Sequence, residues 1–138
     1  MPTSVIDTAK AQVIAYNDKN WDAVRKCAAA QLYYDEVATQ RTARGVDDVI
    51  KLWQGWATAL PDSRASFDKV AVSGNTVTLE LTWRGTHKGP LKTPTGEIAP
   101  TGKNIEIRAC QIVEVANDKV NSVRQYFDMG TLLKQLGA

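Results

Sequence analysis

The sequence contains few residues of the kinds that bind metals or form disulfide bonds, with one histidine and two cysteines among 138 residues. Cys27 and Cys110 lie far apart and form no redox or metal motif, so we expect two buried free thiols. Because Cys, His and carboxylate residues do not cluster, the sequence predicts no zinc site. It also lacks a glycine-rich phosphate loop, so no nucleotide is expected. These absences together predict a protein that works without a metal or cofactor.

The chain also has little net charge and no long apolar run. Its formal net charge is +2, and scattered Lys and Arg residues argue against a nucleic-acid stripe or a membrane-binding face. No apolar stretch approaches the roughly 20 residues of a transmembrane helix. Residues 1–7 lack the basic and apolar regions of a signal peptide. We therefore expect a cytoplasmic protein with no nucleic-acid or membrane partner.

What is present suits a single domain over residues 1–138, because 43% hydrophobic residues can form a sizeable core. A capping pattern at Ser4 and Asp7 predicts the first helix, and the periodic apolar stripe that follows Gly45 predicts the longest one. The expected order is helices at 4–16 and 21–28, a strand at 32–37, a loop at 38–45, a helix at 47–60, strands at 67–72 and 76–84, a loop at 88–102, strands at 105–115 and 119–127, and a terminal helix.

Segregated helices and antiparallel strands predict an α+β fold. A curved, mostly antiparallel sheet wrapped around the long helix can enclose an apolar pocket. Cys110, Ile112 and Glu114 form one row of the strand at 105–115, and the opposite row must serve the pocket. Glu106 and Arg108 are expected to face solvent or a partner. We therefore expect a homodimer formed through the convex face of the sheet.

The last strand ends at Asp128, next to Tyr126 and Phe127. A carboxylate among aromatic side chains has a raised proton affinity, which suits acid or base catalysis near neutral pH. Asp is equally a favoured N-cap residue, so Asp128 can instead cap the terminal helix. The local sequence leaves both interpretations open.

Several short motifs follow one another in a characteristic order: Ala-Tyr-Asn-Asp-Lys-Asn-Trp-Asp at 15–22, Arg-Gly-Val-Asp-Asp-Val at 44–49, Trp-Gln-Gly-Trp at 53–56, Gly-Thr-His-Lys-Gly-Pro-Leu at 85–91, and Tyr-Phe-Asp followed by Leu-Leu-Lys-Gln-Leu-Gly at 126–137. By these motifs the chain resembles the SnoaL-like polyketide cyclase family, within the nuclear-transport-factor-2-like superfamily of cone-shaped α+β barrels. The resemblance covers nearly the whole chain.

The resemblance implies an open cone with an apolar pocket, usually dimeric, without metal or cofactor. Some relatives close polyketide rings by intramolecular aldol chemistry, and others in the superfamily isomerise steroids or open epoxides. The family's acid/base carboxylate at the end of the last strand matches Asp128. A second acid, about nine residues before the glycine that opens the long helix, matches Glu36, where Glu-Val replaces the usual Asp-Pro pair.

His87 falls in the same alternating row as Leu81 and Trp83, which predicts that it faces inward near the pocket mouth as a proton carrier or hydrogen-bond donor. It can equally be a loop histidine between Gly85 and Gly89. A further set of aromatic side chains could line the cavity for a flat apolar ligand: Tyr16, Trp53, Trp56, Trp83 and Tyr126. For Trp53, at helical spacing, a core position is the competing interpretation.

The function favoured by these patterns is a cofactor-free enzyme acting on a small apolar carbonyl compound. Asp128 would move a proton next to the carbonyl, leading to aldol cyclisation or isomerisation. His87, Tyr16 or Tyr126 would donate a hydrogen bond to the developing enolate oxygen. Two alternatives remain, an epoxide hydrolase of the same fold and a non-catalytic carrier or sensor of a small apolar ligand.

Overall fold

The computed structural model describes residues 4–138. Over this range the chain forms the following elements: α1 (Val5–Asn17), α2 (Trp21–Cys27), β1 (Ala28–Glu36), β2 (Arg41–Arg44), α3 (Val46–Ala59), β3 (Arg64–Ser73), β4 (Thr76–Thr86), β5 (Leu91–Thr93), β6 (Gly96–Ile98), β7 (Asn104–Ala116), β8 (Lys119–Phe127) and α4 (Met129–Leu136). Among these residues, no helix has both the length and the apolar character needed to cross a membrane.

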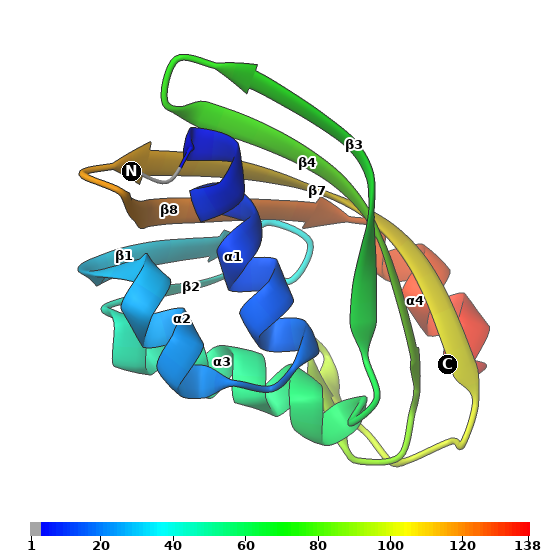
Figure 1. Ribbon diagram of the computed structural model, residues 1–138. Coiled ribbons are helices and arrows are strands. Elements are labelled where there is room, and N and C mark those ends of the chain that lie inside the picture. Colours follow the sequence, from blue (N-terminus) through cyan, green and yellow to red (C-terminus); the bar gives the residue numbers. More distant parts are fainter. Residues whose placement is uncertain (1–3) are drawn as a thin grey trace.

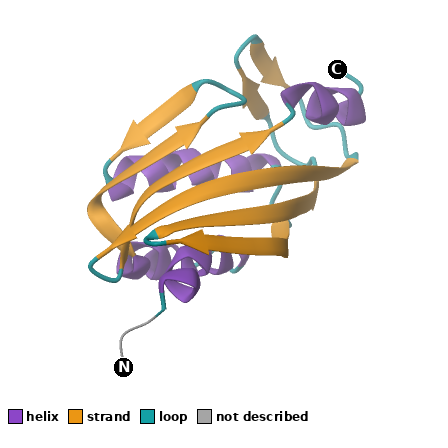
Figure 2. Ribbon diagram, turned by 90° about the horizontal axis from the view of Figure 1, so that it is seen from above, coloured by secondary structure: helices purple, strands orange, loops and turns teal. Residues whose placement is uncertain are grey.

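The strands form one large curved sheet and one small hairpin. The large sheet has six strands in the order β2-β1-β8-β7-β4-β3, and β5 pairs with β6 separately. Adjacent strands of this sheet run antiparallel, except for β1 and β8, which run parallel to each other. Figure 1 shows α1, α2 and α3 on the side toward which the sheet curves, and Figure 2 shows the sheet lying over them, with α4 at one end. The expected α+β fold with a mostly antiparallel, curved sheet is confirmed.

Helix α1 begins where the sequence predicts. The Asp7 backbone N–H donates to Ser4 Oγ at 3.0 Å, which supplies the N-cap. Ala9, Val13 and Tyr16 are buried along one stripe, and this stripe faces the sheet. The helix is thereby fixed across the concave face, where its side chains can form one wall of a cavity.

Helix α3 forms the opposite wall. Gly45 precedes it with a φ of 93°, a left-handed conformation that glycine adopts without strain. Val49, Ile50 and Trp53 lie on the buried stripe that the sequence predicted. The helix ends at Ala59, where the Leu60 N–H bonds back to the Trp56 carbonyl oxygen and Pro61 follows.

Strand β7 shows the alternation expected of a sheet with one buried face. Its odd-numbered residues from Ile105 to Val115 are buried, whereas Glu106 and Arg108 are exposed on the outer face, as expected. The turn to β8 is made by Asn117 and Asp118, both with positive φ values (54° and 58°), which suits a tight hairpin turn. The inner faces of β7 and β8 therefore meet the helices with the side chains that line the cavity.

Two stretches predicted as loops contain strands. The segment at 38–45 holds β2, which pairs with the end of β1, and the segment at 88–102 holds β5 and β6. These three strands are three or four residues long, and β2 is polar, so none of them shows a recognisable alternation of apolar and polar residues. The parallel pairing of β1 with β8 joins segments far apart in sequence, so no local pattern indicates it.

Candidate functional site

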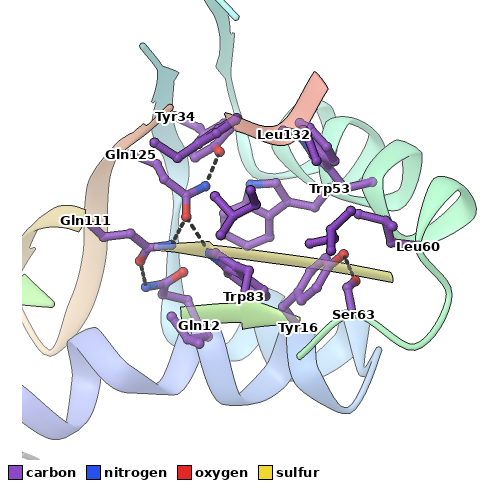
Figure 3. Close-up of a pocket in the computed structure, with 15 residues that line it drawn as sticks. Gln12, Tyr16, Tyr34, Trp53, Leu60, Ser63, Trp83, Gln111, Gln125 and Leu132 are labelled. Carbon is purple, nitrogen blue, oxygen red and sulfur yellow. Dashed lines mark hydrogen bonds between the residues drawn. The ribbon is translucent and has the colours of Figure 1, made fainter. Parts of the chain in front are cut away.

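A partly open cavity lies between the concave face of the sheet and the helices. Its volume is about 80 Å³. Most of its lining is aromatic or aliphatic, with a few hydroxyl and amide groups, and Figure 3 draws these side chains: Gln12, Val13, Tyr16, Tyr34, Trp53, Trp56, Leu60, Ser63, Trp83, Ile105, Ile107, Gln111, Gln125, Phe127 and Leu132. Concave apolar sites with few polar groups are typical of small-molecule binding.

The aromatic walls contain four of the five residues that the sequence proposed, namely Tyr16, Trp53, Trp56 and Trp83. Tyr16 and Trp83 meet edge to face, with ring centroids 5.2 Å apart and planes at 89°. Further edge-to-face pairs join Tyr34 to Trp53 at 5.5 Å and Trp56 to Phe127 at 5.9 Å. Edge-to-face contacts of this kind are favourable, so they stabilise the arrangement of the rings that wall the cavity.

One side of the cavity is polar, because three glutamine side chains meet there. Trp83 Nε1 donates to Gln125 Oε1 at 3.0 Å, and Gln111 Nε2 donates to the same oxygen at 3.1 Å. Gln12 Nε2 donates to Gln111 Oε1 at 2.7 Å (Figure 3). Gln12 and Gln111 are almost completely buried, and their amides are held together by this network.

The network continues behind the cavity to Glu36. Gln125 Nε2 donates to the Tyr34 hydroxyl oxygen, and the Tyr34 hydroxyl donates to Glu36 Oε2, both at 2.7 Å. Trp56 Nε1 donates to the same carboxylate oxygen at 2.8 Å. Burial, and then the nearby charge of Glu36, raise the pKa of the Tyr34 hydroxyl well above its usual value. Tyr34 therefore stays protonated and acts as a donor toward the carboxylate.

Glu36 is completely buried and lies outside the lining, behind Tyr34 and Trp56. Its Oε1 accepts from Thr39 Oγ1 at 2.6 Å and from Arg41 Nη2 at 2.8 Å. The carboxylate is thus paired with an arginine and has donors on both oxygens. The sequence proposed Glu36 as a second catalytic acid, whereas the structure places it at the end of a buried network and not beside the space where a ligand would lie.

The other end of the cavity carries a pair of hydroxyl groups. Tyr16 Oη and Ser63 Oγ lie 2.7 Å apart, and Figure 3 shows them beside Leu60. Burial raises the pKa of Tyr16 to about 12, so its hydroxyl is neutral at physiological pH. Lys19 Nζ donates to the Ser63 carbonyl oxygen at 2.6 Å, which helps to fix the segment that carries Ser63.

Asp128 differs from the expectation of a pocket carboxylate. It is exposed and caps α4, because Gly130 N donates to Oδ1 at 3.0 Å and Thr131 Oγ1 donates to Oδ2 at 2.8 Å. The hydrogen bonds from Thr131 and Gly130 lower its pKa, so the expected raised pKa is wrong. The reason is the alternation of β8, which turns Gln125 and Phe127 toward the cavity and Asp128 away from it.

The same alternation corrects the expectation for Tyr126. Its side chain is 43% exposed and lies on the outer face of the sheet, where Cys110 is its cross-strand neighbour. It therefore does not line the cavity. Phe127, the next residue along β8, takes the aromatic position that the sequence had assigned to Tyr126.

His87 is fully buried, as an inward-facing residue should be, but it does not line the cavity. The Thr101 backbone N–H donates to His87 Nδ1 at 3.2 Å, and Thr101 Oγ1 lies 3.0 Å from the same nitrogen. His87 Nε2 has no hydrogen-bond partner among residues 4–138. The alternating row ends at Thr86, where β4 ends, and His87 belongs to the segment that bonds to Gly102 and Lys103.

The sequence patterns did not predict a place in the cavity for the polar residues Gln12, Ser63, Gln111 and Gln125, or for Tyr34. A signal for the glutamines was present, because each is a polar residue within a buried apolar row. Gln12 falls between Ala9, Val13 and Tyr16 on the stripe of α1, and Gln111 interrupts the apolar row of β7. A polar residue in such a row needs a partner, so it indicates a network or a ligand.

In the part of the chain that the structure describes, no group of three or more His, Cys, Asp or Glu side chains could hold a metal ion. The sequence profile of the SnoaL-like polyketide cyclases matches residues 6–136. A search of curated proteins gives no match.

Solved structures share the fold at low sequence identity. A proposed SnoaL-like polyketide cyclase from Jannaschia sp. CCS1 superposes with a TM-score of 0.86 at 15% identity, covering 97% of this chain and 92% of that one. IdmH, a proposed polyketide cyclase from Streptomyces antibioticus, gives 0.84 at 20% identity, covering 99% and 100%. An LEH-like epoxide hydrolase from M. tuberculosis gives 0.73 at 19% identity, covering 96% and 88%. At these identities the likeness shows the fold alone.

Proposed function

Since the chain belongs to the SnoaL-like polyketide cyclase family, we propose that its cavity binds a small, largely apolar carbonyl compound and promotes its cyclisation or isomerisation. The observation that carries this proposal is the Tyr16–Ser63 hydroxyl pair, 2.7 Å apart, at one end of a cavity otherwise walled by aromatic and aliphatic side chains. An apolar ligand with one oxygen would place that oxygen at this pair and its body against the rings.

The hydroxyl pair would act as a hydrogen-bond donor. One hydroxyl donates to the other, so the second hydrogen remains for a ligand oxygen, whichever of Tyr16 and Ser63 donates. Because the pKa of Tyr16 is about 12, the group holds its proton at neutral pH. A fixed donor in an apolar site stabilises the negative charge that develops on a carbonyl oxygen, and loss of such a donor typically slows a reaction about 10²-fold or more.

The lining contains no carboxylate and no histidine among the described residues. Asp128 faces away from the cavity, and both oxygens of Glu36 are occupied by donors. We therefore assign to the protein the folding of a flexible substrate and the polarisation of its carbonyl group. In an aldol closure of this kind, the enol carbon bonds to the carbonyl carbon and the enol proton ends on the carbonyl oxygen. Holding the two ends together supplies much of the acceleration.

The cavity volume limits the size of the first ligands to be tested. A volume of about 80 Å³ is well below the roughly 300–1,000 Å³ of pockets for drug-sized ligands. The first ligands to be tested are therefore no larger than a single ring with short substituents. A longer substrate requires lining side chains to move, and Leu132 on α4 is one that stands at the end of the cavity (Figure 3).

A second candidate function is supported by the same lining. A cavity without an acid or base other than tyrosines of raised pKa can bind an apolar ligand and release it unchanged. The protein would then be a carrier or sensor. Epoxide hydrolysis is less well supported, because it requires carboxylates around a water molecule, and the described lining contains none.

The proposal is tested with 2,6-heptanedione, a small diketone whose aldol closure gives a six-membered ring. Binding is measured by thermal shift, because a ligand that binds only the folded state raises its stability. Ring closure is followed by the absorbance of the enone that forms when the β-hydroxyketone product loses water. Binding with accelerated closure, reduced about 10²-fold in Tyr16→Phe/Ser63→Ala, supports the enzyme. Binding without closure supports the carrier, and absence of binding by this and related small ketones contradicts both.

A further inference from the structure

The hydrogen-bond network beside the cavity has a fixed direction, because its two ends have only one role each. The Trp83 indole N–H can only donate, and the Glu36 carboxylate, paired with Arg41, can only accept. Gln125 and Tyr34 connect them by hydrogen bonds of 3.0, 2.7 and 2.7 Å. These two ends decide which way every group between them must point.

From Trp83 the direction can be followed atom by atom. Gln125 must turn Oε1 toward the indole N–H, so its Nε2 faces the Tyr34 oxygen, and the Tyr34 hydrogen goes to Glu36. Gln111 must use Nε2 toward the same Gln125 oxygen, at 3.1 Å. Turning either amide over would place two donors or two acceptors against each other at a buried site, which costs about 1–3 kcal/mol for each unmade bond.

Gln12 is the last member of the network, and its orientation follows from that of Gln111. Gln111 Oε1 accepts from Gln12 Nε2 at 2.7 Å, and the same nitrogen donates to the Ala9 carbonyl oxygen at 3.0 Å. Both hydrogens of the Gln12 amide are therefore used. Gln12 Oε1 accepts no hydrogen bond from the described residues, and Figure 3 shows it turned away from Gln111, toward the other side chains that line the cavity.

We propose that Gln12 Oε1 selects a ligand that carries a hydroxyl group, which donates to it, at the end of the cavity opposite the Tyr16–Ser63 pair. This deepens the proposed function and rests on it, because it assumes that the cavity binds a small carbonyl compound. The two ends then have opposite chemistry. The glutamine end accepts a hydrogen from the ligand, and the hydroxyl end donates one to the ligand carbonyl.

The placement of the two ends further limits the ligand. Gln12 and Tyr16 are four residues apart on α1, so their side chains leave the same face of the helix and reach the same cavity. The substrate class is therefore a compact hydroxyketone, with its two oxygens at opposite ends of an apolar body.

The test compares 4-hydroxyacetophenone with 4-methoxyacetophenone and acetophenone by isothermal titration calorimetry on the wild-type protein. All three carry the ketone, but only the first can donate a hydrogen bond to Gln12. We expect 4-hydroxyacetophenone to bind about tenfold more tightly than the methoxy compound, the effect of one buried hydrogen bond. Equal affinities for the three ketones would overturn the inference and leave the proposed function intact.

A double variant, Gln12→Met/Gln111→Met, removes both amide acceptors at this end with side chains of similar length. Replacing both partners of a buried hydrogen bond by apolar groups of similar shape is often nearly neutral for stability. The preference for the hydroxyl compound should fall to about one in this variant. Gln54→Met, at an exposed position of α3, is the matched control and should retain the tenfold preference.

The outcomes separate the two proposals. If none of the three ketones binds to the wild-type protein, the proposed function fails, and this inference with it. If the ketones bind and the preference survives in the double variant, Gln12 is not the selecting group and the inference alone is wrong. If the double variant does not fold, the comparison of hydroxyl and methoxy compounds on the wild-type protein still decides.

Discussion

The hydroxyl oxygens of Tyr16 and Ser63 lie 2.7 Å apart, although 47 residues separate them in the sequence. The contact joins the last turn of α1 to the segment between α3 and β3. Neighbouring bonds hold the same junction, because the Asn17 amide both donates to the Ala65 carbonyl oxygen at 3.0 Å and accepts from the Ala65 N–H at 2.8 Å. The donor pair proposed to contact a ligand carbonyl is therefore fixed by the fold before any ligand binds.

The first prediction follows from burial of the Tyr16 hydroxyl, whose pKa is about 12 in the folded protein against a usual value of 10.0. Below pH 10 both states are protonated and the stabilisation is fully present. Above pH 10 the unfolded state loses its proton first, so the free energy of unfolding decreases until about pH 12. Tyr16→Phe removes this loss, which amounts to about 3 kcal/mol.

Urea unfolding measured at intervals from about pH 8 to pH 12 checks this prediction. Tyr34 also has a raised pKa, but it is present in both proteins and cancels in the comparison. The wild-type protein should lose stability more steeply with pH than Tyr16→Phe. Parallel curves for the two proteins would contradict the burial of the Tyr16 hydroxyl.

A second prediction concerns the buried carboxylate of Glu36. Glu36→Gln leaves Arg41 without its counter-ion and sets the new NH2 group against two donors, so we expect a loss of about 2–4 kcal/mol in the free energy of unfolding. The control is Glu106→Gln, which breaks an exposed pair with Arg84 at the same 2.8 Å distance and should cost less than about 1 kcal/mol. Similar losses in both variants would show that Glu36 anchors no network.

A third prediction addresses the cap formed by Asp128. Asp128→Ala removes the acceptor for Gly130 and Thr131, so it should lower the melting temperature. Asp128→Asn should leave the melting temperature nearly unchanged, because Asn caps a helix about as well as Asp. Because the pKa of Asp128 is lowered, its extra stabilisation is present above pH 3.8 and is lost as the pH falls further. The difference in melting temperature between the wild-type protein and Asp128→Ala should therefore become smaller as the pH falls below 3.8.

Asp128→Asn also tests the catalytic role that the family resemblance suggested. With the carboxylate outside the cavity, the variant should bind 2,6-heptanedione as the wild type does and close the ring at the same rate. A large loss of turnover with unchanged binding would show that Asp128 leaves its cap and enters the cavity during the reaction.

The sequence predicted those parts of the fold that have a strong local pattern. The stripe of Val49, Ile50 and Trp53 located α3, and the alternation of β4 and β7 located the central strands. Short polar strands such as β2 carry no such pattern, because they are stabilised by pairing with β1. Pairing of β1 with β8 depends on distant segments, and distant pairing leaves no local signal.

The site was only partly predictable for a related reason. Aromatic residues on predicted stripes, such as Tyr16 and Trp53, were placed correctly because the period of a helix fixes which face they occupy. On β8 the alternation is interrupted by a bulge opposite Glu114 and Val115, so that Val120 and Val123 both point inward despite their odd spacing. A one-residue shift of this kind decides whether Gln125 or Asp128 faces the cavity.

A final prediction concerns two glycines near the end of the cavity formed by α3. A Cβ at Gly89 would lie 2.1 Å from the carbonyl oxygen of Thr58, which is backbone and cannot move away cheaply. Gly89 and Lys88 also donate their backbone N–H groups to the Ala59 carbonyl oxygen, at 3.1 and 3.0 Å. Gly89→Ala should therefore push this segment off the end of α3 and cost about 2 kcal/mol or more.

Gly55 provides the opposite case on the same helix. It lies within α3, and a Cβ there would meet nothing within 4 Å, so Gly55→Ala gains helix propensity without a clash. We expect it to raise the free energy of unfolding by about 0.5–1 kcal/mol. Because the same substitution is made at both sites, a difference in sign between the two variants isolates the close packing of Gly89 against α3. If Gly89→Ala is as stable as the wild type, the segment that carries His87 does not press on the helix, and this end of the cavity is looser than the structure indicates.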